Sequence, residues 1–309
     1  MAPYILARES WWITHMKNIQ RNYWAYVIFV VPALLIYVTF YLYPLFQSLQ
    51  YSLTKWNGIN DPVFVGLSNF AKAFSDEQFW VSFKNNIYFV LFSVFIQVPF
   101  IVFISIIVSS AKRFLNFYKL TVFLPCILST ASIGVIWQFI YSPDAGLLNQ
   151  LLTAVGLESW KRIWLGDEAT AFLSILLTNG WQWTGFYIVL VLAAIFAIPK
   201  EMLEAGEMDG ATGWRKAWLL TIPLIRPVIM VTLLLSITGA MKALDIILIM
   251  TKGGPFGSSE VMASYMYKQA YTINDFGYAN AIAVIVSLFT AVLSLIFQYI
   301  NVKTREASE

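Results

Sequence analysis

The chain has few side chains that carry enzyme chemistry. In 309 residues it has one histidine, His15, and one cysteine, Cys126. A Ser-His-Asp triad therefore cannot form within the long apolar segments, and a four-cysteine or Cys-x-x-Cys metal site is excluded. No Gly-x-x-x-x-Gly-Lys-Ser/Thr run occurs, so the chain has no phosphate loop of that type. The sequence predicts no catalytic residues, no metal ligands and no cofactor in this chain.

Polar and aromatic side chains inside long apolar segments are the candidates for binding chemistry. A polar group is costly in a bilayer, so such residues mark either a solute path or a packing contact. Aromatic rings and amides together suit the apolar faces and hydroxyls of a sugar. The candidates for a solute path are Gln97, Gln138, Asn179, Trp181, Trp183, Tyr187, Lys242 and Asp245. The alternative is hydrogen bonding between helices for the glutamines, and packing or an interfacial belt for the aromatic residues.

Lys242 and Asp245 need separate mention because they are the two charged candidates. They stand three residues apart, and on a continuous helix they would lie on one side. Two interpretations remain open: a polar pair that lines a cavity, or a structural ion pair near the outer interface.

The elements that must position these residues are membrane helices. Apolar residues make up 59% of the chain and charged residues 12%, which is about half the charged share of soluble domains. A hydrocarbon core about 30 Å thick requires roughly 20 apolar residues as helix. The segments that meet this requirement are 23–43, 86–109, 119–141, 169–198, 227–250 and 279–302. The predicted fold class is an all-α polytopic membrane protein with six transmembrane helices.

The distribution of lysine and arginine predicts the orientation. With both termini in the cytoplasm, twelve of the 20 cations lie on the inner side. The short segment 110–119 carries three cations and no acid, and the reverse topology would place this basic loop outside. Residues 1–22 are predicted as a cytoplasmic amphipathic segment on the inner membrane surface, with a disordered tail as the alternative. Residues 303–309 are predicted as a cytoplasmic tail.

The inner segment 199–226 is densely charged but neutral, with four acidic and four basic residues. Pro199 favours the start of a helix, and Asp209-Gly210 is a turn signal. A second amphipathic stretch follows, and Pro223 and Pro227 are expected to break or kink the chain as it re-enters the membrane. The segment is therefore predicted as a cytoplasmic helix–turn–helix that docks in a groove of a partner.

This segment resembles the EAA loop of ATP-binding-cassette (ABC) importer permeases. The pattern of that loop is Glu-Ala-Ala, three residues, Gly, nine residues, then Ile-x-Leu-Pro. Three positions depart from it: Gly206 replaces the second Ala, Leu220 replaces Ile, and Ile222 replaces Leu. The resemblance implies that the residues that couple to the ATPase are Glu204, Ala205, Gly206, Asp209, Gly210, Ala211 and Pro223.

The resemblance covers nearly the whole chain. The runs Phe64–Phe70, Trp181–Ile198 and Thr251–Pro255 look like the carbohydrate-uptake permeases related to the maltose-transporter membrane subunits. The resemblance implies that residues 23–302 are a six-helix permease domain, with the coupling loop at 199–226. This domain would form half of the translocation path for a sugar or oligosaccharide.

The resemblance also implies a set of partners. These are a second permease subunit, two ATPase subunits that bind ATP and Mg²⁺, and an external solute-binding protein. The resemblance favours a second permease subunit that is a different chain over a second copy of this one. The expected location is the inner (cytoplasmic) membrane of a bacterium, and no nucleic-acid partner is expected.

Two other classes make different demands on the sequence. A self-sufficient secondary transporter or channel would show intramembrane acid chains or paired broken helices in two related halves. A membrane enzyme would need clustered catalytic groups at membrane depth. The sequence shows neither pattern.

Overall fold

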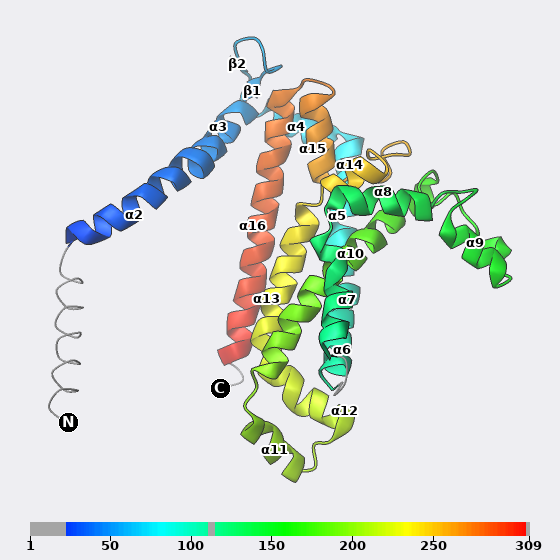
Figure 1. The fold of residues 1–309 in the computed structure, drawn as a ribbon. Helices are drawn as coiled ribbons and strands as arrows, with labels where there is room; N and C mark the ends of the chain where they lie inside the picture. The colour runs from blue at the N-terminus through cyan, green and yellow to red at the C-terminus, as the bar shows by residue number, and fades with distance from the viewer. Residues whose placement is uncertain (1–22, 111–114, 307–309) are drawn as a thin grey trace. The chain divides into compact units, whose positions relative to one another are not determined.

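The computed structural model describes residues 23–110 and 115–306, which are almost entirely helical (Figure 1). The predicted amphipathic segment 1–22, together with Lys112 and Arg113 of the basic loop, lies outside these residues. The chain divides into two compact units, Met1–Tyr51 and Ser52–Glu309.

The described part of the first unit is one long helix. It consists of α2 (Tyr23–Tyr37), the π-helical turn η1 (Val38–Leu42) and α3 (Tyr43–Ser52), whose last residue belongs to the second unit. Val27–Ser52 is long and apolar enough to cross a membrane. Within this unit, no side chain described between Val27 and Tyr51 is buried.

The second unit is a helical bundle. In it α10 packs against α6, α7 and α13, and α13 packs against α5 and α16. Figure 1 shows α4, α14 and α15 at one end of the bundle and α11 and α12 at the other. Its elements in chain order are β1 (Thr54–Lys55), β2 (Val63–Phe64), α4 (Ser68–Ser75), α5 (Glu77–Phe92), η2 (Ser93–Gln97), α6 (Val98–Ser109), α7 (Leu115–Ile127), α8 (Thr130–Ile140), α9 (Leu147–Ala154), η3 (Glu158–Trp160), α10 (Glu168–Phe196), α11 (Lys200–Met208), α12 (Gly213–Lys216), η4 (Ala217–Thr221), α13 (Ile222–Met241), α14 (Asp245–Met250), α15 (Met262–Tyr271) and α16 (Phe276–Glu306). β1 and β2 form a short antiparallel hairpin.

The predicted all-α polytopic fold class is confirmed. Five helices in the described ranges are long and apolar enough to cross a membrane, and a bent pair makes a sixth. The third predicted span is that bent pair, because α7 and α8 meet at 96° instead of forming one straight helix. Pro125 lies in the last turn of α7, and the extended Ser129 (ψ 143°) caps α8 with its hydroxyl, which explains the break.

The fifth and sixth predicted spans differ at their ends. The fifth runs from Gly213 to Met241 as one helix made of α12, η4 and α13. Of the break or kink expected at Pro223 and Pro227, the break is therefore wrong, because the helix continues through both prolines. The last helix continues to Glu306, so the first residues of the predicted tail extend α16.

Three π-helical turns explain how helices continue past their prolines. η1, η2 and η4 end two residues before Pro44, Pro99 and Pro223, respectively. Proline has no N–H, and its ring crowds the carbonyl four residues earlier. In each π turn the residue before the proline bonds five residues back, as Val98 does to the Ser93 carbonyl. The wider turn makes room for the ring, so the helix is not interrupted.

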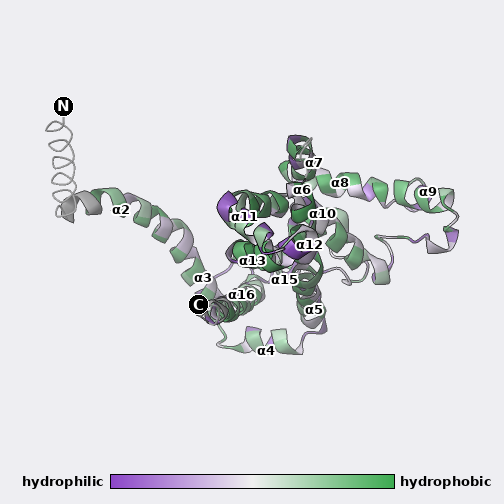
Figure 2. Ribbon diagram, turned by 90° about the horizontal axis from the view of Figure 1, so that it is seen from below, coloured by the Kyte–Doolittle hydropathy of each residue, from purple (hydrophilic) through white to green (hydrophobic). Residues whose placement is uncertain are grey.

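The buried apolar side chains of the second unit form three clusters. One joins α5, α8, α10 and α14 around Phe89 and Ile246, and a second joins α6, α10 and α13 around Ile101 and Leu192. The third joins α4, α5, α15 and α16 around Phe79. Figure 2 shows hydrophobic residues along the bundle helices and hydrophilic ones at α11 and α12. The core thus fixes the frame around one cavity and one projecting loop.

Candidate functional site

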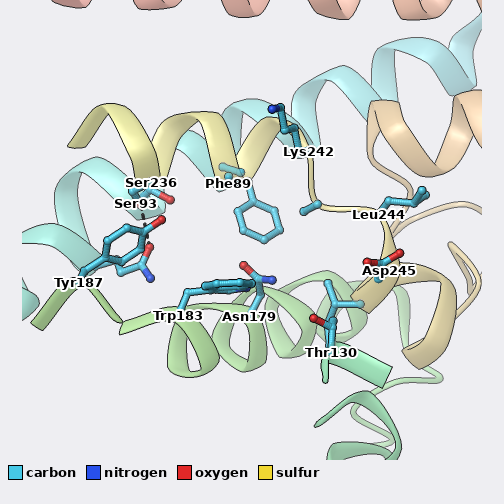
Figure 3. Close-up of a pocket in the computed structure, with 15 residues that line it drawn as sticks. Phe89, Ser93, Thr130, Asn179, Trp183, Tyr187, Ser236, Lys242, Leu244 and Asp245 are labelled. Atoms are coloured by element: carbon cyan, nitrogen blue, oxygen red, sulfur yellow. Dashed lines mark hydrogen bonds between the residues drawn. The ribbon is translucent and has the colours of Figure 1, made fainter. Parts of the chain in front are cut away.

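A cavity of about 240 Å³ opens between η2, α10 and the junction of α13 with α14 (Figure 3). The structure brings six of the eight predicted solute-path residues together around it. These are Gln97, Asn179, Trp183, Tyr187, Lys242 and Asp245.

The α10 side of the cavity carries unused hydrogen-bonding groups. Asn179, Trp183 and Tyr187 are spaced by four residues, so they share one face of α10. Figure 3 shows Asn179 and Trp183 across the cavity from Phe89 of α5. Within the described part of the chain, neither the Asn179 amide nor the Trp183 indole N–H has a hydrogen-bond partner. An amide beside an aromatic ring is thus available to a solute.

Gln97 also lines the cavity, but its amide is occupied. Its Nε2 donates to the Gly180 carbonyl at 3.2 Å and lies 3.4 Å from Thr184 Oγ1. Its Oε1 accepts a hydrogen bond from Ser236 at 3.0 Å. Since these partners lie on α10 and α13, the contacts favour the interpretation that Gln97 joins helices.

The expected arrangement of Lys242 and Asp245 is wrong. α13 ends at Met241 and α14 begins at Asp245, so the two residues are not on one continuous helix. Neither takes part in a salt bridge among the described residues, and Figure 3 shows them apart along the cavity wall. The cavity therefore has one unpaired cation and one unpaired anion.

Gln138 and Trp181 lie outside the cavity. Gln138 Nε2 donates to the carbonyls of Ile249 at 2.7 Å and Met250 at 3.1 Å, at the end of α14. Trp181 packs edge to face on Trp137, with ring centroids 5.4 Å apart. Both side chains thus contact neighbouring helices.

Sequence reasoning missed nine of the 15 lining residues, among them Phe89, Ser93, Thr130 and Ser236. Ser93 lies four residues before Gln97, so helical spacing from a predicted residue was a usable signal for it. Ser236 lies six residues before Lys242, which is not a same-face spacing, so no predicted residue points to it. No spacing points to Thr130, because the break between α7 and α8 places it there.

The segment between α11 and α12 contains the predicted turn. Gly210 has φ +81° after the helix end at Asp209, a left-handed conformation that glycine adopts without strain. The Ala211 N–H donates to the Gly206 carbonyl at 2.9 Å. Glu207 and Lys216 join the two helices by a salt bridge of 2.6 Å. A turn between two helices is present, although α12 continues directly into η4 and α13.

Two of the three departures from the EAA pattern touch each other. A Cβ atom added at Gly206 would lie 2.7 Å from Cδ2 of Leu220. The missing methyl at position 206 therefore makes room for the Leu220 side chain.

The predicted coupling residues are only partly accessible. Glu204, Ala205, Asp209 and Gly210 are exposed, whereas Ala211 is buried. Pro223 lies on α13, away from the turn. Met208 is 89% exposed at the end of α11, so an apolar side chain projects among the charged ones.

A hydrogen-bond network centred on Asp76 joins α5, α15 and α16 at the end of the bundle away from α11 and α12. Asp76 caps α5 by accepting from the Gln78 N–H, and its other oxygen accepts from the hydroxyls of Tyr265 and Tyr278, the latter at 2.6 Å. Burial alone would raise the pKa of the Asp76 carboxyl, but the hydrogen bonds from the two tyrosines and the α5 amides outweigh it and lower that pKa. Burial and the Asp76 carboxylate raise the pKa of Tyr265.

A polar cavity beside broken membrane helices, with a charged loop at one end, defines a polytopic membrane transport component. Residues 73–306 match the family described as binding-protein-dependent transport system inner membrane component. The chain belongs to this family.

Named relatives span nearly the whole chain. The probable ABC transporter permease protein YurN of Bacillus subtilis is 35% identical over 271 residues, which are 87% of this chain and 92% of that protein. The lactose transport system permease protein LacF of Rhizobium radiobacter is 30% identical over 276 residues, 88% of this chain and 92% of that protein. The trehalose/maltose transport system permease protein MalF of Thermococcus litoralis is 28% identical over 276 residues, 89% and 92% of the two chains.

The fold is also that of a solved transporter chain. A chain in the crystal structure of a bacterial ABC transporter involved in the import of the acidic polysaccharide alginate superposes with a TM-score of 0.81 at 21% identity. The match covers 94% of this chain and 99% of that chain.

Proposed function

We propose that this chain is one of two permease subunits of a binding-protein-dependent ABC importer for a sugar or oligosaccharide. The observation that carries the proposal is the cavity, which gathers six predicted solute-path residues in a chain of this family. The lactose and trehalose/maltose systems named for two relatives support a sugar as the solute.

The chemistry of the cavity suits part of a sugar. The rings of Phe89 and Trp183 offer apolar faces, and the unpaired Asn179 amide offers a donor and an acceptor. The volume of about 240 Å³ is below the roughly 300–1,000 Å³ of enclosed ligand pockets. A second permease subunit, which the resemblance implies to be a different chain, would supply the facing wall.

The exposed residues around Gly210 would dock on a cytoplasmic ATPase, which would bind ATP and Mg²⁺. Both termini are then cytoplasmic, and an external solute-binding protein delivers the solute at the end that carries α4 and α15. Gly213–Met241 is one helix of 29 residues, about 43 Å long. Because it starts at the docking loop and ends beside Lys242, a push on the loop would displace the cavity wall.

Purification of the complete complex by a tag on this chain tests the proposal. We expect a second permease, an ATPase and sugar-dependent stimulation of ATP hydrolysis when the binding protein is added. Recovery of this chain alone, active in uptake without ATP, would instead identify a self-sufficient transporter.

Glu204→Lys tests the docking loop. The variant is expected to lower uptake while leaving solute binding by the external protein unchanged, because it reverses a charge on the exposed docking surface. Glu158→Lys, the same change at an exposed position in η3, outside the segment from α11 to α12, is the matched control. Equal uptake in both variants would contradict the docking role.

A further inference from the structure

A second cavity lies at the end of the bundle that carries α11 and α12. It has a volume of about 550 Å³ and opens between the last turns of α6 and α10 and the segment from α11 to η4. It shares no lining residue with the solute cavity. Its walls are mainly apolar, and in the described part of the chain Lys200 and Lys216 are its only charged lining residues.

This cavity lies at the level where two membrane spans end. Ser109 and Phe196, which both line it, are the last residues of the spans Glu77–Ser109 and Glu168–Phe196. Trp214 lines it as well and stacks on Phe103 of α6, with centroids 5.5 Å apart. Its indole N–H has no hydrogen-bond partner among the described residues. A tryptophan in this setting is typical of the lipid headgroup level.

The charge around the cavity is positive. Lys200 forms no ion pair within the described ranges, and Lys216 pairs with Glu207, which does not line the cavity. Lys119 lies 4.6 Å from the centroid of the Phe196 ring. Ammonium groups around an apolar cleft between membrane helices are complementary to the phosphate of an acidic lipid.

An apolar track leads from the cavity into the membrane. Ile96, Phe100, Phe103 and Ile107 follow one face of η2 and α6 at spacings of four, three and four residues. They are 58%, 52%, 47% and 43% exposed, respectively. From Ile96 to Ile107 the helix rises about 16 Å along its axis, which is close to half of a hydrocarbon core about 30 Å thick. The track therefore has the length of one leaflet.

We propose that this cavity binds the headgroup of an anionic phospholipid, with its phosphate between Lys200 and Lys216 and one acyl chain along the α6 track. A phospholipid reaches the cleft without leaving its leaflet, and it alone fills both the charged and the apolar part. In the orientation proposed above, this is the inner leaflet. The inference requires only that the chain spans a bilayer, so its failure would leave the proposed import function standing.

Native mass spectrometry of the complete complex tests the proposal. The complex is exchanged into micelles doped with phosphatidylglycerol or with phosphatidylcholine of the same acyl chains. The unpaired Lys200 predicts about fivefold stronger retention of phosphatidylglycerol, which rises to about thirtyfold when Lys216 exchanges Glu207 for the phosphate. Equal retention of the two lipids by the wild-type complex would overturn the proposal, and this comparison needs no variant.

Variants then locate the site. Lys200→Gln with Lys216→Gln should reduce phosphatidylglycerol retention to that of phosphatidylcholine, and Lys200→Arg with Lys216→Arg should preserve it. If the double variant does not fold, Lys200→Gln alone is used, and it is expected to reduce phosphatidylglycerol retention about fivefold. Lys161→Gln removes an exposed lysine that does not line the cavity and should have no effect. An unchanged lipid preference in Lys200→Gln would overturn the assignment, as would displacement of the lipid by millimolar inorganic phosphate.

Discussion

Replacing Gln97 and Asn179 by alanine separates the two roles that a polar residue has inside this membrane domain. Both residues line the solute cavity. Gln97 is 7% exposed and hydrogen-bonds to α10 and α13. Asn179 is half-buried and has no hydrogen-bond partner in the described ranges. Gln97→Ala should therefore reduce stability, and Asn179→Ala should reduce solute transport.

The structure sets the size of each effect. Gln97→Ala removes the bond to the Gly180 carbonyl and the one from Ser236. Interhelical hydrogen bonds in membranes contribute about 0.6 kcal/mol on average and up to about 1.7, so we expect a loss of about 1–3 kcal/mol. Asn179→Ala should cost less than about 0.5 kcal/mol, because it breaks no bond within the protein. Losing one hydrogen bond to a solute, about 0.5–1.5 kcal/mol, should slow uptake about two- to tenfold.

Two measurements on each variant decide the matter. Thermal unfolding of the purified complex gives the change in stability, and uptake by proteoliposomes that contain equal amounts of folded complex gives the transport rate. The reasoning is refuted if Asn179→Ala melts as early as Gln97→Ala while its uptake stays normal.

Three other perturbations test separate parts of the structure. Asp76→Asn should destabilise the complex by about 1–3 kcal/mol. Because the pKa of Asp76 is lowered in the folded protein, its contribution to stability is complete above about pH 3.9 and is lost as the pH falls through the folded pKa. The melting temperatures of the variant and the wild type should therefore converge in acid. Gly206→Ala should lower the melting temperature and Leu220→Ile should relieve that cost, with a coupling of about 0.5–3 kcal/mol in a double-mutant cycle; strict additivity would show that the two positions do not interact. Lys242→Gln should weaken competition by acidic sugars in an uptake assay, and Asp245→Asn should strengthen it; identical shifts in both variants would show that the cavity charges do not contact the solute.

Composition and spacing were sufficient for the fold class and for six of the residues that line the cavity. Span length depends on bilayer thickness, so six apolar segments were recognisable without tertiary information. Asn179, Trp183 and Tyr187 share a helix face by spacing alone. The turn at Gly210 also follows from local residue types, since glycine after aspartate favours the left-handed conformation found there.

The errors concern places where tertiary contacts decide whether a helix continues. Pro223 was expected to break or kink the chain, but the π turn η4 before it makes room for the ring and the helix continues past it. Conversely, nothing in the local sequence between Met241 and Asp245 is a strong breaker, yet α13 ends and α14 begins there. The position of a proline therefore does not by itself predict where a helix in a bundle ends, because neighbouring helices supply hydrogen-bond partners for the backbone groups that a break leaves unpaired.

The same contacts explain why only some of the polar residues in the spans are available to a solute. A helix that ends at membrane depth leaves carbonyls that water does not reach, and each needs a donor. Asn86 donates to Ala240 in the last turn of α13, Gln138 donates to Ile249 and Met250 at the end of α14, and Gln182 lies 3.4 Å from the carbonyl of Leu128 after α7. These amides accompany the breaks that shape the cavity. Asn179, Trp183 and Lys242 donate to no such carbonyl in the described structure, and Asp245 takes part in no salt bridge there. These are therefore the polar groups of the cavity that we expect to be available to a solute.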